Sequence, residues 1–102
     1  MSASVTFSPT AQTHVETIGA WWRTNRLAAP DLLAEELAAA IDRLALSPLS
    51  GHVYEAGEAG RYLRLLLQRS RYHVYYRFAA EDDVVCIHAV WHTARGDGPE
   101  LL

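Results

Sequence analysis

The spacing of apolar residues changes once along this chain, near residue 60, from a helical period to a strand period. Apolar side chains at Ala11, Val15, Ile18 and Trp22 lie four, three and four residues apart, which places them on one face of an α-helix. From Arg61 onward, apolar and polar residues tend to alternate, as they do in a half-buried β-strand. The change predicts a helical segment followed by a run of strands.

Prolines and their neighbours mark the ends of two predicted helices. Ser8 can cap the first helix, Pro9 suits its first position, and the apolar stripe continues to about Asn25. A second helix starts near Pro30 and ends before Pro48, because the residue before a proline avoids the helical region. Its apolar stripe comprises Leu33, Leu37, Ala40, Ile41 and Leu44. Two helices joined by a short turn make an antiparallel helical hairpin.

Four segments are expected to be β-strands. Residues 4–7 alternate before the first helix, and residues 61–68, 71–79 and 83–91 follow the second, joined by short connections typical of an antiparallel meander. Residues 49–60, which contain three glycines, are expected to form a loop. The predicted fold class is α+β with the order β-α-α-β-β-β. The N-terminal strand and the helical hairpin are expected to pack on one face of a mainly antiparallel sheet.

Strand alternation predicts what the face opposite the helices carries. The apolar sets that should face the helices are Leu63, Leu65, Leu67, Tyr72, Val74, Tyr76 and Phe78. The open, exposed face should then hold Tyr62, Arg64, His73, Tyr75 and Arg77. The last strand is largely apolar on both sides, so its sides stay open, and Cys86, His88, Val90 and His92 form one alternating set.

Length and composition favour a single cytoplasmic domain spanning residues 1–102. Half of the 102 residues are hydrophobic, enough for one modest core, although a domain of this size is only marginally stable without a partner. There is no run of ~18 apolar residues to span a membrane and no secretory leader. The one cysteine, Cys86, cannot form an internal disulfide and is expected to be a buried filler in a reducing compartment.

Positive charge is distributed unevenly. The formal net charge is −3, which gives the whole molecule no electrostatic attraction to nucleic acid. All nine basic residues are arginines, and five of them lie between residues 61 and 77 without one acidic residue. The arginine fork suits carboxylates and phosphates and is common at interfaces. A partner-binding face and a merely solvated sheet face are both compatible with this pattern.

Taken together, these segments resemble the RelE/ParE toxin superfamily over nearly the whole chain. The resemblance rests on the opening VTFSPTA at residues 5–11, the helical hairpin, YLRLLL at 62–67, YHVYYR at 72–77 and the closing VVCIHAVWHTAR at 84–95. It implies the toxin of a type II toxin–antitoxin (plasmid stabilisation) system that arrests growth. It also implies a cognate antitoxin whose tail is disordered when free and often acidic, and a toxin–antitoxin hetero-oligomer. An acidic tail would match the arginine-rich strands.

The superfamily splits by mechanism, and the residues favour the ParE-like branch. RelE-like members cleave mRNA on the ribosome and need several cations with a general acid and base. Here Leu66 occupies the position two residues beyond Arg64, His73 stands where an arginine would be, and no tyrosine follows Arg95. ParE-like members are non-enzymatic and bind DNA gyrase, which blocks replication. A ribosome-dependent endoribonuclease using Arg64, His73, Arg77 and His92 remains the alternative, and a decayed toxin that only binds its antitoxin is the third possibility.

Candidate partner-binding residues follow from the same patterns. Trp21 lies outside the apolar stripe of its helix and is a candidate interface anchor. The other candidates are Arg61, Arg64, Arg71, Arg77, His92 and Arg95. No cofactor is expected. No metal site is expected either, because His88 and His92 would lie ~13 Å apart along a strand.

Overall fold

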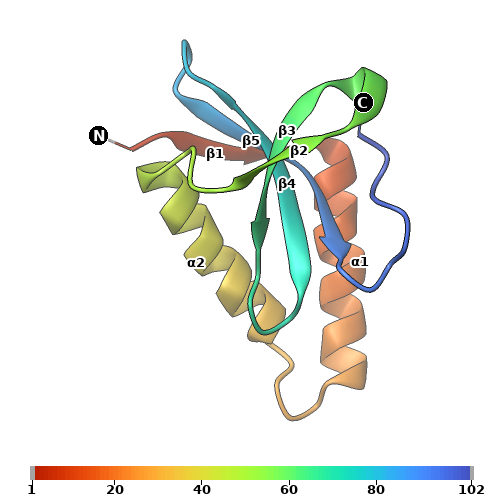
Figure 1. The fold of residues 1–102 in the computed structure, drawn as a ribbon. Helices are drawn as coiled ribbons and strands as arrows, with labels where there is room; N and C mark the ends of the chain where they lie inside the picture. Colours follow the sequence, from red (N-terminus) through yellow and green to blue (C-terminus); the bar gives the residue numbers. More distant parts are fainter. Residues whose placement is uncertain (1, 102) are drawn as a thin grey trace.

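Two helices and a five-stranded sheet make up the computed structural model, which describes residues 2–101 (Figure 1). The elements are β1 (Ser4–Phe7), α1 (Pro9–Asn25), α2 (Leu32–Leu46), β2 (His52–Glu55), the 3-10 turn η1 (Gly57–Ala59), β3 (Arg61–Leu66), β4 (Tyr72–Ala79) and β5 (Val84–His92). The predicted α+β class and the order of the predicted elements are confirmed. Within residues 2–101, neither helix is long and apolar enough to cross a bilayer.

The strands lie in the order β1-β5-β4-β3-β2, and only β1 runs parallel to its neighbour, β5. The prediction of a loop over residues 49–60 is wrong in part, because residues 52–55 form the edge strand β2 and pair with β3. The reversal between β2 and β3 uses Gly57 and Gly60, whose φ angles of +61° and +94° lie in the region that favours glycine. The glycines that suggested a loop instead close a hairpin.

Helix α1 follows β1 directly. Residues at its start and in its first turns contact the edge of β5 with which β1 pairs. The Ser8 hydroxyl caps α1 by accepting a hydrogen bond from the Ala11 N–H at 3.1 Å, as expected for a serine before a helical proline. The Ser8 N–H donates to the Ile87 carbonyl at 2.9 Å, and the Val90 N–H donates to His14 Nδ1 at 3.2 Å. These contacts satisfy backbone groups of β5 beyond the end of β1.

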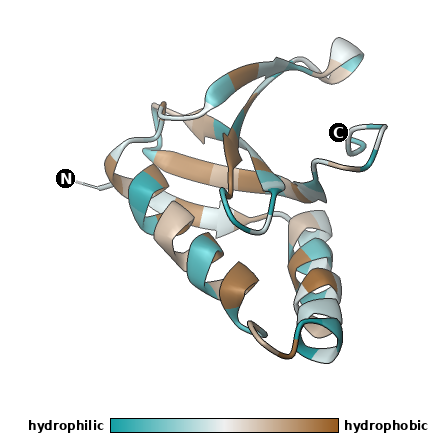
Figure 2. Ribbon diagram, turned by 60° about the horizontal axis from the view of Figure 1, so that its bottom comes forward, coloured by the Kyte–Doolittle hydropathy of each residue, from teal (hydrophilic) through white to brown (hydrophobic). Residues whose placement is uncertain are grey.

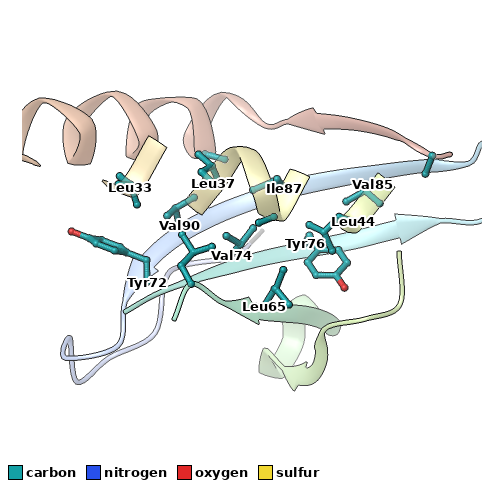
Figure 3. Close-up of a cluster of buried hydrophobic side chains, with 14 of the residues drawn as sticks. Leu33, Leu37, Leu44, Leu65, Tyr72, Val74, Tyr76, Val85, Ile87 and Val90 are labelled. Carbon is teal, nitrogen blue, oxygen red and sulfur yellow. The ribbon is translucent and has the colours of Figure 1, made fainter. Parts of the chain in front are cut away.

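The main core lies between the helices and one face of the sheet (Figures 2 and 3). Both predicted helical stripes face this core, and Leu44 is fully buried in it. Val74 and Ile87, from the two central strands, are buried to the same extent. The Trp22 indole N–H donates to the Tyr72 hydroxyl at 3.3 Å, which ties α1 to β4 inside the core.

A β-bulge in β5 changes the side of the sheet on which the later residues of this strand lie. Tyr75 pairs with Ala89 but Tyr76 pairs with Ile87, so His88 is an extra residue without a partner on β4. The single alternating set of Cys86, His88, Val90 and His92 is therefore wrong. Cys86 and His88 lie on the side away from the helices, whereas Val90 belongs to the helix-side core and His92 pairs with the core residue Tyr72.

The Glu36 side chain of α2 accepts hydrogen bonds from the turn between β3 and β4. Its two carboxylate oxygens accept hydrogen bonds from the N–H groups of Arg69 (2.9 Å) and Ser70 (2.7 Å). Partial burial raises the pKa of Glu36, but these hydrogen bonds and the charge of Arg69 outweigh it, so the pKa lies below its ordinary value. The contact fixes the hairpin relative to the helices.

Replacing Glu36 with glutamine should lower the free energy of unfolding at neutral pH by about 1 kcal/mol, because charged acceptors bind N–H groups more strongly than neutral ones. A carboxylate with a lowered folded-state pKa stabilises the fold above its unfolded pKa, and this contribution is lost as the pH falls through the folded pKa. Urea unfolding of both proteins at neutral pH and at about pH 3 should therefore show a difference that becomes smaller in acid. Glu35→Gln, one residue earlier, is the matched control; an equal loss there would contradict a specific role for Glu36.

Candidate functional site on the open face of the sheet

A second apolar cluster covers the face of the sheet opposite the helices. It contains Tyr62, Tyr75, Ala89 and Leu101, with Tyr54 and Trp91 packed against them. Tyr62 and Tyr75 are only 1% and 3% exposed. The expectation that these two tyrosines lie on an exposed surface is therefore wrong, because the C-terminal segment folds back over them.

This C-terminal segment, residues 93–101, is referred to below as the strap. It leaves β5 and returns beside the connection between β2 and β3, on the side of the sheet away from the helices (Figures 1 and 2). The Trp91 indole N–H donates to the Asp97 carbonyl at 2.7 Å, and Leu101 is 6% exposed in the second cluster. Gly98 lies so close to Tyr54 that an added Cβ would be 2.5 Å from the hydroxyl oxygen.

A polar cavity of about 360 Å³ lies between the sheet and the start of the strap. Its lining residues are Tyr54, Arg64, His73, Tyr75, Trp91, His92, Thr93, Arg95, Gly96 and Gly98. Four of the five strands and the strap contribute to it, so it forms only after these four strands have paired. We call it the face cavity.

Aromatic rings hold the two arginines of the face cavity. The Arg64 guanidinium lies 4.9 Å from the centre of the Tyr54 ring and donates to the Tyr75 hydroxyl at 3.5 Å. The Arg95 guanidinium lies 3.7 Å from the Trp91 ring. Stacking on aromatic faces orients these cations without neutralising them, so the cavity favours anionic groups.

His73 is the titratable group of the face cavity with a shifted pKa. Partial burial, followed by the charges of Arg64 and Arg71, lowers its pKa below the ordinary histidine value. The imidazole is therefore mostly neutral at neutral pH and can accept a proton or a hydrogen bond. The pKa of His88 is lowered in the same way, by burial and then by Arg77.

The predicted site residues separate into a group at the cavity and several outside it. Arg64, His73, His92 and Arg95 line the cavity together. Arg77 lies at the other end of the face, with its guanidinium 3.9 Å from the Tyr62 ring and donating to the Ala59 and Arg61 carbonyls. The fold therefore does not bring Arg77 together with His73 and His92 around one cavity.

Two other predicted arginines have local roles. Arg61 forms an ion pair with Glu55 at 3.2 Å, and both side chains are well exposed, so the pair contributes little to stability. Arg71 is exposed in the turn before β4, where its φ of +66° is unusual for a residue other than glycine. Its carbonyl accepts a hydrogen bond from the Thr93 N–H at 2.9 Å, which anchors the start of the strap.

Trp21 lies on the helical hairpin, far along the chain from the cavity residues. It is 44% exposed, with the Arg26 guanidinium 4.9 Å from its ring. Leu27, in the turn after the same helix, is 80% exposed. Its role as an interface anchor remains a prediction, as do the partner-binding roles of the arginines and His92.

Tyr54 and Leu101 also belong to this face, although neither was predicted to lie there. The alternating His-Val-Tyr-Glu at residues 52–55 was a signal for the strand that carries Tyr54, but the flanking glycines outweighed it. Leu101 is an apolar residue in an otherwise polar tail, and no periodicity could show where such a residue packs. The bond from Val90 to His14 had no sequence signal, because it depends on the bulge in β5.

Comparison with known proteins identifies the class of this chain. Residues 5–96 match the family model described as the ParE toxin of the type II toxin–antitoxin system, parDE. The chain therefore belongs to the ParE toxin family and is the toxin component of a type II toxin–antitoxin system. The crystal structure of the toxin–antitoxin complex RelBE2 from Mycobacterium tuberculosis has a similar fold, with a TM-score of 0.68 and 23% identity over 92% of this chain and 94% of that chain. No curated protein sequence matches this chain.

Proposed function

We propose that this toxin inhibits DNA gyrase by binding it, blocks replication, and is neutralised by a cognate antitoxin. The observation that carries the proposal is the match to ParE toxins over residues 5–96, which include the helical hairpin, the sheet and the first part of the strap. ParE-like members of the superfamily act on gyrase without hydrolysis. An antitoxin partner is supported by the same match and by the fold shared with a chain of a toxin–antitoxin complex.

The arrangement of the open face agrees with binding rather than cleavage. Arg64 is held by two tyrosines, and the next outward-facing position on β3 is Leu66, which lies directly opposite His73. RelE-like nucleases carry a second cation at this alternating position of the strand, where it helps to stabilise the charge that develops on the scissile phosphate. An apolar side chain at that position does not supply it.

A ribosome-dependent RNase is the second candidate, and one observation favours it. The face cavity brings a mostly neutral imidazole, His73, together with two arginines, Arg64 and Arg95. A neutral imidazole can accept a proton from an attacking hydroxyl, and an arginine can stabilise a phosphate. The two candidates therefore differ in whether His73 is essential.

Inducing this chain without its antitoxin and following thymidine and methionine incorporation separately tests the proposal. We expect thymidine incorporation to fall first while methionine incorporation continues. If methionine incorporation falls first, and His73→Gln restores it, the RNase candidate is correct and the gyrase proposal is wrong. If neither changes and growth continues, the chain is a decayed toxin.

A supercoiling assay with purified gyrase then tests the face cavity. Arg64→Ala and Arg95→Ala should each weaken inhibition about tenfold, the effect expected for an arginine at the centre of an interface. Arg64→Lys should recover only part of the loss, because lysine keeps the charge but not the planar fork. Arg23→Ala on α1 is the control, and equal losses for all three alanine variants would argue against the cavity as the contact point.

A further inference from the structure

We infer that His14 of α1 is a positioning residue for the face cavity, and that protonation of its imidazole weakens the toxin by releasing the end of β5. His14 accepts a hydrogen bond from the backbone of β5 and contacts Trp91, whose ring in turn lies against the guanidinium of Arg95. The loss of activity that this implies rests on the proposed function, whereas the contacts of His14 can be tested without it.

His14 satisfies a buried donor at the outer edge of β5. The pairing of β1 with β5 ends at Phe7 and Ile87, so the rest of this edge needs other partners. Val90 is 1% exposed, and its N–H donates to His14 Nδ1 at 3.2 Å. A buried N–H without an acceptor is costly, because it has lost its hydrogen bond to water. The imidazole therefore fixes the backbone of β5 directly before Trp91.

Only the uncharged imidazole can accept this hydrogen bond. A neutral imidazole carries its proton on one nitrogen and offers the other as an acceptor, whereas an imidazolium has an N–H on both. Because Nδ1 accepts from Val90, the neutral His14 carries its proton on Nε2. A second proton on Nδ1 would place two donors against each other. Protonation of His14 would therefore break the contact with β5.

The same imidazole contacts a wall of the face cavity. The ring centres of His14 and Trp91 lie 5.6 Å apart, with an angle of 55° between the ring planes. The Arg95 guanidinium lies 3.7 Å from the centre of the Trp91 ring, and both Trp91 and Arg95 line the cavity. His14 is thus linked to a cation of the cavity through one aromatic ring. A shift of the β5 backbone at Val90 would move this ring, and Arg95 with it.

The charges around His14 oppose its protonation. Partial burial, followed by the charge of Arg95, lowers the pKa of His14 below the ordinary histidine value. The one acid of α1, Glu16, lies two residues further, about 200° around the helix. Asp97 contacts Trp91 through its carbonyl oxygen, and no acid within residues 2–101 forms an ion pair with His14. The contact is lost as the pH falls through this lowered pKa, which lies below the ordinary value of about 6.5.

An NMR titration of the full-length, nitrogen-labelled chain tests the contact without gyrase. We expect His14 Nδ1 to be unprotonated at neutral pH, and the Val90 amide signal to titrate together with this imidazole. In His14→Asn the side-chain oxygen can accept the same hydrogen bond but cannot titrate, so the Val90 signal should lose this titration. A proton on Nδ1 at neutral pH, or a Val90 signal that stays fixed while His14 titrates, would overturn the inference.

The second experiment measures the affinity of the full-length chain and its variants for gyrase at about pH 7.5 and about pH 5.5. His14→Ala removes the acceptor and should weaken binding about tenfold at the higher pH. His14→Asn keeps an acceptor and should bind like the unmodified chain at this pH. On acidification the unmodified chain should lose at least about threefold more affinity than His14→Asn, because only its acceptor can be protonated.

Thr17→Asn is the matched control, since Thr17 is exposed on the same helix, and its affinity for gyrase should not change. Equal losses for Thr17→Asn and His14→Ala would contradict a specific role for the contact. The pKa values of His73 and His88 are lowered as well, so an equal acid loss in the unmodified chain and His14→Asn would assign the effect to other groups and overturn the role of His14. If the unmodified chain does not bind gyrase, the proposed function is wrong, and the NMR titration decides the inference on its own.

Discussion

Replacing Leu44 with alanine should lower the free energy of unfolding by about 2–5 kcal/mol, the cost of emptying a core position that cannot collapse. Leu44 is fully buried near the end of α2, among the side chains of the central strands (Figure 3). A domain of this size has only ~5–15 kcal/mol of stability, so the variant should lose a large share of it. Thermal unfolding should show a midpoint lowered by more than about 10 °C.

Leu46→Ala provides the matched control for this prediction. Leu46 lies two residues later in the same helix and is 74% exposed, so the same substitution removes little buried surface. Its unfolding midpoint should stay close to that of the unmodified chain. Similar losses at both positions would mean that the helix itself, rather than the core contact, determines the effect.

Replacing Gly51 with alanine should cost about 3 kcal/mol, because the added methyl group has no room. A Cβ at this position would lie 2.8 Å from the Arg64 carbonyl oxygen and 2.7 Å from the Tyr76 hydroxyl oxygen. Neither neighbour can move freely, since the first belongs to the backbone of β3 and the second to a fully buried side chain. The Gly51 N–H also donates to the Tyr76 hydroxyl at 2.9 Å, and this bond would be strained.

The expected consequence of Gly51→Ala reaches the face cavity as well as stability. Gly51 directly precedes β2, whose Tyr54 stacks on the guanidinium of Arg64. Urea unfolding should show the loss of stability, and the supercoiling assay should show weaker gyrase inhibition. Gly96→Ala is the control for the unfolding measurement, because an added Cβ there meets no atom within 4 Å. An unchanged unfolding midpoint for Gly51→Ala would show that β2 can shift outward without cost.

Much of the fold could be predicted from the sequence because local patterns determine it. The apolar stripe that ends at Trp22 indicates which residues of the first helix are buried. The alternation from Arg61 onward does the same for the strands. Ser8 and Pro48 mark helix ends by local hydrogen bonding and sterics, and α1 and α2 begin and end close to the predicted positions. These signals need no knowledge of distant parts of the chain.

The candidate site was predicted only in part, because its geometry depends on distant contacts. Alternation alone placed Arg64 and His73 on the same face, and both line the face cavity. Alternation could not place His92, because the bulge at His88 reverses the sides of the strand beyond it. A one-residue irregularity of this kind is a feature of the pairing with β4, which is not visible within β5 alone.

The helical hairpin and the alternating strands follow from local patterns of residues, and the order of these segments along the chain carries the resemblance to RelE/ParE toxins. The order of the strands, the edge strand β2, the bulge and the burial of Tyr62 and Tyr75 beneath Leu101 emerge only in the folded chain. The difference lies in the range of the interactions. Periodicity and capping act over one or two turns, whereas the packing of the strap depends on a surface that exists only after the strands have paired.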